Sequence, residues 1–311
     1  MRDSRPILAT FALIAVSLLC AGIAQSKERL WYKYENAYFE VYSNANEKPL
    51  RRFLESLENF RAASLQMLSF EIPDGAVKTQ VVVFSSRPQF QAIVEDKNIA
   101  AVMVGMDDAP YMVLPLTRGR GGSDHFLRHE YTHVLLAYSP HRFPPWYHEG
   151  FAEFMSGTEF KKKGTVFTLG DEIDRVLVGR KRVPWNELLS DNYNLHAQPS
   201  GELGSNAYYQ AWILTHYLMI GNNFENYPAL GRYLGRFAAG EASVAAFKAE
   251  FGREPSEVAE QALTHYSNRM PYYEIPFKPG AQDHDFVRTG TDRDEMATLI
   301  DQLRDRWQSG P

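Results

Sequence analysis

SDHFLRHEYTHVLLAY, residues 123–138, is the stretch that determines how the rest of this 311-residue chain is interpreted. Its apolar residues recur at helical spacing, which predicts a helix over 124–138. His129 and His133 are four positions apart, so both imidazoles project from one face of this helix, with Glu130 beside them. Two imidazoles at this spacing can reach one zinc ion, because zinc readily accepts imidazole nitrogen as a ligand.

A third ligand is expected from a second helix, predicted over 146–157 after a proline break. Glu149 and Glu153 are four positions apart and share one face of it. Glu149 can supply a carboxylate oxygen to zinc, and Glu153 can accept a hydrogen bond from a ligating histidine. His148 and His141 compete for the role of third ligand. However, His148 projects about 100° away from Glu149, and His141 lies in a proline-containing turn that we expect to be exposed.

The two motifs together resemble those of the gluzincin zinc metallopeptidases, the peptidase MA-like superfamily that includes thermolysin and the aminopeptidase N group. The likeness rests on His-Glu-x-x-His at 129–133 and on Trp-Tyr-His-Glu-Gly-Phe-Ala-Glu at 146–153, whose first glutamate follows His133 after fifteen residues. The resemblance implies bound Zn²⁺ and a water molecule activated by Glu130. The metal ligands that it implies are His129, His133 and Glu149.

A third stretch extends the resemblance to the helix that follows in aminopeptidase-like members. AYYQAWILTHYL at 207–218 is similar to a helix that begins with a tyrosine in those enzymes. That phenol hydrogen-bonds the oxyanion formed when water adds to the substrate carbonyl. The register favours Tyr208 for this role, with Tyr209 as the alternative.

Two segments before the histidine-bearing helix bear on substrate binding. The strand predicted over 111–115 resembles the edge strand on which gluzincins bind an extended peptide, which implies substrate contacts by Tyr111 and Val113. Before it, Gly-Met-Asp-Asp at 105–108 stands where aminopeptidase N-like enzymes have a Gly-x-Met-Glu-Asn motif that holds a free amino terminus. Asp107 is therefore a further candidate for substrate binding. Aspartate replaces both Glu and Asn of that motif, and an ordinary acidic turn is the alternative.

The order of the expected elements indicates an α+β protein, and the resemblance implies a zincin-like fold. Up to about residue 118, strands alternate with helices; the strands are expected at 36–44, 80–84, 101–104 and 111–115, and the helices at 48–69 and 87–95. Beyond residue 119 nearly every pattern is helical; these segments are 124–138, 146–157, 206–220, 226–238, 241–251 and 255–267.

Three parts of the mature chain follow from this order. We expect an α/β subdomain over 25–138 with a small mixed sheet, ending in the histidine-bearing helix. A mainly helical subdomain over 139–270 would then contribute the third ligand. Residues 271–311 are expected to form an extended connector followed by an amphipathic helix over 292–307.

Residues 1–24 have the pattern of a secretory signal. Arg2 and Arg5 precede an apolar run and a small-residue stretch that ends at Ala24. A retained membrane anchor and lipidation of Cys20 are the alternatives. Cys20 is the only cysteine, so a cleaved protein would rely on its core or on a metal rather than on disulfides. We therefore expect an exported protein, periplasmic or secreted.

The composition and the motifs leave three functional hypotheses. A net charge of −5 and a pI near 6.0 give no support to nucleic-acid binding. The leading hypothesis is an exported zinc metallopeptidase that cleaves peptide or protein substrates. The others are a zinc-stabilised scaffold or peptide-binding module of the cell envelope without turnover, and a structural envelope protein with incidental histidines. Membrane contact is expected only through an uncleaved N-terminal anchor, and no sequence feature indicates an oligomeric state.

Overall fold

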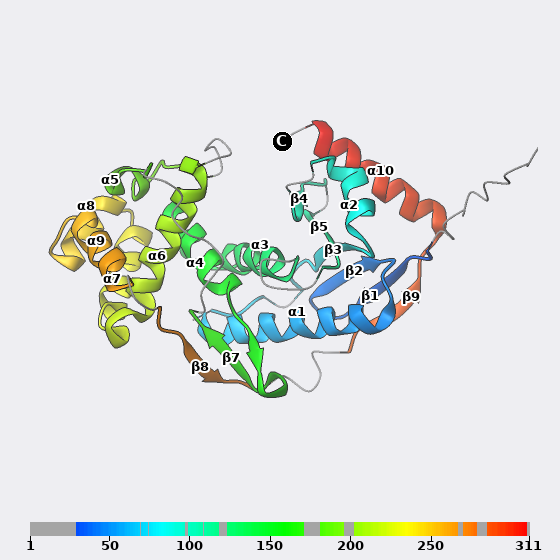
Figure 1. Cartoon of the computed structure of the whole chain (residues 1–311), viewed down its shortest axis with the longest axis horizontal. Helices are drawn as coiled ribbons and strands as arrows, with labels where there is room; N and C mark the ends of the chain where they lie inside the picture. The colour runs from blue at the N-terminus through cyan, green and yellow to red at the C-terminus, as the bar shows by residue number, and fades with distance from the viewer. Residues whose placement is uncertain are drawn as a thin grey trace, which may run out of the picture.

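The computed structural model describes ten stretches of the chain: 29–68, 70–73, 75–96, 99–107, 109–117, 123–170, 181–195, 202–266, 270–278 and 285–309. The expected signal segment over 1–24, with Cys20, and Asp108 lie outside the described residues. Within these stretches no helix is long and apolar enough to span a bilayer. A mixed sheet is followed by a helical region, so the expected combination of a sheet region and a helical half is confirmed (Figure 1).

The main sheet is built from β1 (Tyr32–Glu35), β2 (Phe39–Ser43), β3 (Thr79–Phe84), β4 (Val102–Val104), β5 (Tyr111–Pro115) and β9 (Val287–Gly290), in the order β4-β5-β3-β2-β1-β9. β2, β3 and β5 are parallel, and the remaining pairs are antiparallel. The strand expected over 36–44 is confirmed as β2 over its last residues, but its first residues form a turn, and β1 before them was not predicted. The Asn36 side chain accepts hydrogen bonds from the backbone N–H groups of Tyr38 and Phe39, which closes a turn between β1 and β2.

Helices cover both faces of the main sheet; they are α1 (Glu47–Met67), α2 (Arg87–Val94), α3 (Ser123–Ala137) and α10 (Arg293–Ser309). Successive side chains of a strand point to opposite faces, and β3 shows the result. Val81 and Val83 belong to the core shared with α1 and α3, whereas Val82 and Phe84 belong to the core shared with α2 and α10. β3 is thus buried on both faces, which explains its uninterrupted apolar run.

The C-terminal segment returns to the main sheet. β9 pairs antiparallel with the whole of β1. Trp307 of α10 donates a hydrogen bond from Nε1 to the carbonyl oxygen of Val94 at 3.2 Å, and Arg304 donates to that of Ala92 at the same distance. α10 thereby binds carbonyl groups in the last turn of α2.

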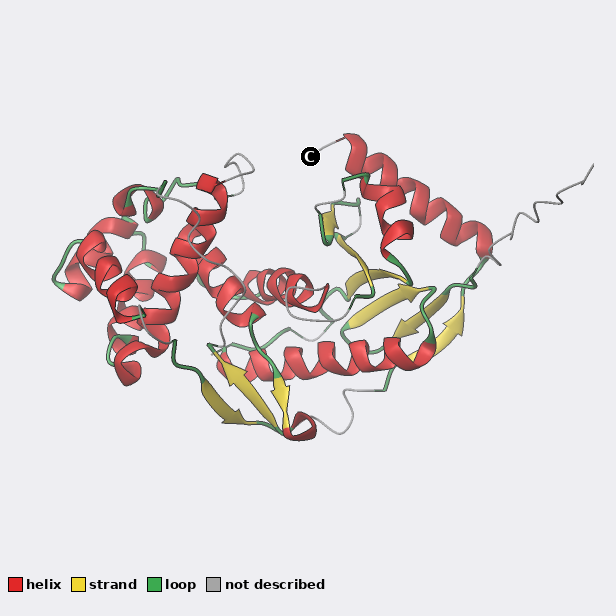
Figure 2. Ribbon diagram, viewed as in Figure 1, coloured by secondary structure: helices red, strands yellow, loops and turns green. Residues whose placement is uncertain are grey.

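A second, three-stranded sheet lies outside the main one; its strands are β6 (Phe160–Lys161), β7 (Val166–Leu169) and β8 (Tyr273–Pro276), with the short helix η1 (Lys162–Gly164) between the first two. The expectation of an almost purely helical chain beyond residue 119 is wrong for this sheet. Its strands have two to four residues, too few for an alternating pattern to be recognised. Figure 2 shows this sheet in yellow beside the helical region.

The helical region consists of α4 (Pro145–Ser156), α5 (Trp185–Leu188), α6 (Glu202–Phe224), α7 (Tyr227–Ala238), α8 (Ser243–Phe251) and α9 (Pro255–His265). α4 lies directly against α6 at Gly150. A β-carbon at this position would overlap the backbone carbonyl of Ala211 and the hydroxyl of Thr215. Glycine therefore allows α4 to lie directly on α6, and this contact fixes the position of the neighbouring Glu149.

Replacing Gly150 with alanine should destabilise the fold, because the Ala211 carbonyl belongs to a helix backbone that cannot move alone. We expect Gly150→Ala to lower the free energy of unfolding by about 1–3 kcal/mol. Gly231→Ala on α7 is the matched control, since nothing lies within 4 Å of its added β-carbon and alanine favours helix by up to about 1 kcal/mol. Urea unfolding of both variants measures the difference, and equal midpoints would contradict the proposed packing constraint.

His216 on α6 is buried with both ring nitrogens bonded. Nε2 lies 2.9 Å from the carbonyl oxygen of Gly170, so it must donate. Burial lowers the pKa of His216 to about 4, so the ring is neutral at pH 7. Its Nδ1, 2.7 Å from the Tyr266 hydroxyl, then accepts a hydrogen bond from that group.

The neutral His216 ring should make stability depend on pH. Between the unfolded pKa near 6.5 and the folded pKa near 4, the unfolded chain binds the extra proton. Stability is therefore complete above about pH 6.5 and falls, by up to about 3 kcal/mol, as pH decreases toward 4. Urea unfolding of metal-free protein from pH 7 to 4 measures this loss. His216→Gln cannot titrate and should show a shallower decline; an unchanged slope would contradict the assignment.

Candidate metal centre

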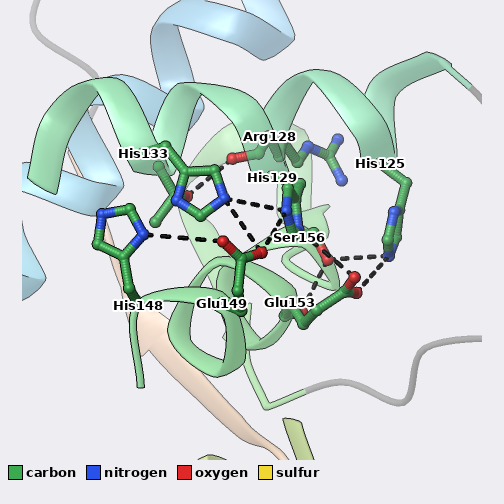
Figure 3. A network of polar contacts seen from close by, with 9 residues as sticks. His125, Arg128, His129, His133, His148, Glu149, Glu153 and Ser156 are labelled. Atoms are coloured by element: carbon green, nitrogen blue, oxygen red, sulfur yellow. Dashed lines mark hydrogen bonds and ion pairs between the residues drawn. The ribbon is translucent and has the colours of Figure 1, made fainter. Parts of the chain in front are cut away.

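The predicted ligands lie on two neighbouring helices, α3 and α4. α3 is held from behind by Leu127, Tyr131 and Leu135, which are buried in the core shared with α1 and the main sheet. Its opposite face presents His129 and His133 toward α4. In Figure 3 both rings point toward the Glu149 carboxylate, which rises from α4 between them.

Three side-chain atoms converge on one point. Nε2 of His129 and Nε2 of His133 are 3.1 Å apart, and each is 3.4 Å from Oε2 of Glu149. Ligand atoms about 2.0–2.1 Å from a tetrahedral zinc ion are separated from one another by roughly 3.3 Å. The spacing of these atoms therefore suits a single small cation that prefers nitrogen and oxygen ligands, and the group could hold one.

Burial shapes the charge of the two rings. It lowers the pKa of His133 to about 4, so this ring is neutral at pH 7 and offers a lone pair. For His129, burial alone would lower the pKa, but its hydrogen bond with Glu149 and the charges of Glu153 and Glu130 raise it overall. Acidic groups thus favour a positive charge at this point, whether it is a proton or a metal ion.

Glu153 stands behind the first histidine. Its Oε1 is 3.5 Å from Nδ1 of His129, and its side chain is 1% exposed. When Nε2 of a histidine faces a metal, the remaining Nδ1 has the proton, and a carboxylate beside it fixes the orientation of the ring. From the sequence Glu153 is expected to orient a ligating histidine, and its carboxylate lies beside the ring of His129.

The competing third ligands lie elsewhere. The His148 ring stacks on that of His133, with centroids 4.5 Å apart, and its Nδ1 is 3.9 Å from Oε1 of Glu149. It therefore borders the convergence point, facing the outer carboxylate oxygen (Figure 3). His141 is exposed and lines a separate apolar pocket of about 750 Å³ between α3, α4 and α7.

The two expected catalytic groups lie near the histidines. Glu130 is half-buried on α3, and its charge acts on His129. Tyr208, near the start of α6, is half-buried with its ring centroid 6.4 Å from that of His129. Its neighbour Tyr209 instead packs on Trp212, with ring centroids 5.4 Å apart. This placement favours Tyr208 over Tyr209 for a role at the centre.

The substrate-binding residues expected on an edge strand require a correction. β5 is not an edge: it pairs with β3 on one side and with β4 on the other, and β4 ends the sheet. The side chains of Tyr111 and Val113 are buried in the core shared with α2 and α10. Asp107 is 91% exposed and pairs with Arg306 of α10. The sequence could not show whether β4 or β5 forms the edge of the sheet, because strand order depends on contacts between segments that lie far apart in the chain.

Two residues of this centre were not identified as candidates from the sequence. His125 of α3 and Ser156 of α4 contact each other, and His125 also faces Glu153 (Figure 3). A signal was available, since His125 precedes His129 by four positions and therefore shares its helix face.

Comparison with known proteins does not assign the chain to a family. No protein-family model matches the chain, and no curated protein is similar to it in sequence. The resemblance to gluzincins thus stays a prediction that rests on the two motifs.

Metal binding should depend on Glu149 and not on His148. We expect wild-type protein to retain one equivalent of zinc after dialysis and to gain about 2.7 kcal/mol of stability when free zinc exceeds the dissociation constant a hundredfold. Glu149→Ala should lose both the metal and the gain, whereas His148→Ala should keep them. Elemental analysis and thermal unfolding with and without zinc measure this. The reverse result would make His148 the third ligand.

Proposed function

We propose that the protein is an exported zinc metallopeptidase of the gluzincin type with a zincin-like fold. The observation that supports this most directly is the convergence of two imidazole nitrogens and one carboxylate oxygen, 3.1–3.4 Å apart, beside a glutamate on the same helix. Three protein ligands are what catalytic zinc sites use, because the fourth position is left for water or substrate.

The chemistry divides between the ion and the chain. When bound, zinc supplies Lewis acidity toward water and toward the substrate carbonyl. Glu130 accepts the proton of the attacking water and later returns it to the leaving amine, as a general base and then a general acid. Tyr208 donates a hydrogen bond to the oxygen on which negative charge develops. Glu153 keeps His129 oriented throughout.

The end of the main sheet supports the proposal that a peptide substrate binds as an added strand. In the described part of the chain β4 has a single strand neighbour, β5, so one side of its backbone can pair with an added segment. An extended peptide binds such an edge by main-chain hydrogen bonds, and side-chain pockets then select its sequence. We infer that β4, rather than β5, guides the substrate.

Glu130→Gln should separate metal binding from catalysis. The amide cannot accept the water proton, so we expect hydrolysis to fall at least 100-fold while one equivalent of zinc remains. The exposed Glu55→Gln on α1 is the control and should match wild type. Mass spectrometry of a diverse peptide library gives the rates. If wild type binds zinc but cleaves nothing, the zinc-stabilised scaffold or peptide-binding module is the better assignment.

Tyr208→Phe should reduce turnover without loss of metal. Removing one hydrogen-bond donor to a developing oxyanion costs about 100-fold in kcat, and KM should change little because the ground state lacks that charge. Tyr209→Phe is the matched control on the adjacent position. Should the effects be exchanged, Tyr209 would be the oxyanion donor.

A further inference from the structure

A third histidine continues the ligand row on α3. His125 lies one turn before His129, and its side chain is 22% exposed. Its Nε2 is 2.8 Å from the Ser156 hydroxyl oxygen and 3.9 Å from Oε2 of Glu153. Figure 3 shows the ring directed at α4, toward these two oxygens.

The direction of the hydrogen bonds follows from counting protons. The Ser156 hydroxyl has one proton, and it donates this proton to the backbone carbonyl oxygen of Glu153 at 2.7 Å. The short contact with His125 must then be donated by the ring, so Nε2 of His125 has a proton. The same N–H group lies on the side of the ring that faces Oε2 of Glu153.

Glu153 is therefore placed between two imidazoles. Oε1 faces Nδ1 of His129 at 3.5 Å, and Oε2 faces Nε2 of His125 at 3.9 Å. A buried carboxylate is costly unless donors surround it, and its rotamer is set by where these donors lie. With an imidazole ring against each of its oxygens, the carboxylate is confined to the orientation that serves His129.

We propose that His125 is a positioning residue of the metal centre: its ring, fixed by the hydrogen bond from Nε2–H to Ser156, lies against Glu153 and keeps that carboxylate in the orientation that aligns His129 with the ion. This inference rests on the proposed function. His125 lies outside the His-Glu-x-x-His motif, so the motif assigns it no role. Loss of a direct partner of a ligating histidine typically weakens metal binding about 10–100-fold, so loss of His125 should weaken it by up to about tenfold.

Three variants at one position test the donor. His125→Leu removes the N–H group but keeps an apolar side chain of moderate size. His125→Asn is polar yet too short to reach Glu153, so it should show the same loss and does not depend on burying leucine. In His125→Gln the amide nitrogen can occupy the place of Nε2, so zinc affinity should return to within about twofold of wild type. Competition with a chromophoric chelator gives the dissociation constants, and urea unfolding without metal verifies that each variant folds.

A double-mutant cycle tests the route through Glu153. If His125 acts through that carboxylate, His125→Leu should change zinc affinity less than about twofold when Glu153→Gln is already present. His141→Asn, at an exposed histidine away from the centre, should leave affinity unchanged. A wild-type affinity in His125→Leu, or an equal loss in both backgrounds, would overturn the inference and leave the proposed function intact. If wild type itself binds no zinc, the proposed function falls and the inference falls with it.

Discussion

The close approach of α3 and α4 is the constraint on which the candidate centre depends. It brings two ring nitrogens and a carboxylate oxygen within 3.4 Å of one another in a largely buried place. Such a cluster of lone pairs is costly unless a cation or a proton occupies the space between them. Because helix packing holds these three atoms together, the space between them favours a positive charge.

Each helix is held by a different part of the molecule. α3 is fixed from behind by the core that it shares with α1 and the main sheet, so the histidines move only if that core moves. α4 is fixed by α6, where Gly150 permits backbone contact. Trp146 adds a hydrogen bond from Nε1 to the Tyr233 hydroxyl on α7 at 2.9 Å. The candidate ligands therefore lie on rigid elements, which is what a precise coordination geometry requires.

The sequence predicted the features that repeat along a helix and missed those that depend on distant partners. The helices around His129 and Glu149 follow from apolar spacing and from a proline break, and their bounds differ from expectation by one residue at each end. β9 has no recognisable pattern because its four residues are exposed and its partner, β1, lies at the other end of the chain. The same non-locality hid β4 as the edge of the sheet, since strand order is decided by tertiary packing.

The spacing of the polar residues on the two helices explains why the centre extends beyond its ligands. α3 presents His125, His129 and His133 at four-residue intervals, about 6 Å apart along the axis. α4 presents its partners in the opposite order; they are Glu149, Glu153 and Ser156.

Each successive contact steps from one helix to the other, so that Glu149 lies between the second and third rings and Glu153 between the first and second. Two antiparallel helices with this spacing form an alternating ladder of imidazoles and oxygen acceptors. A metal ion can bind between His129, His133 and Glu149, where two nitrogens and one carboxylate oxygen meet. The contacts around His125 need only a proton. His125 then orients Glu153, and Glu153 orients His129, because each carboxylate has a ring on both sides.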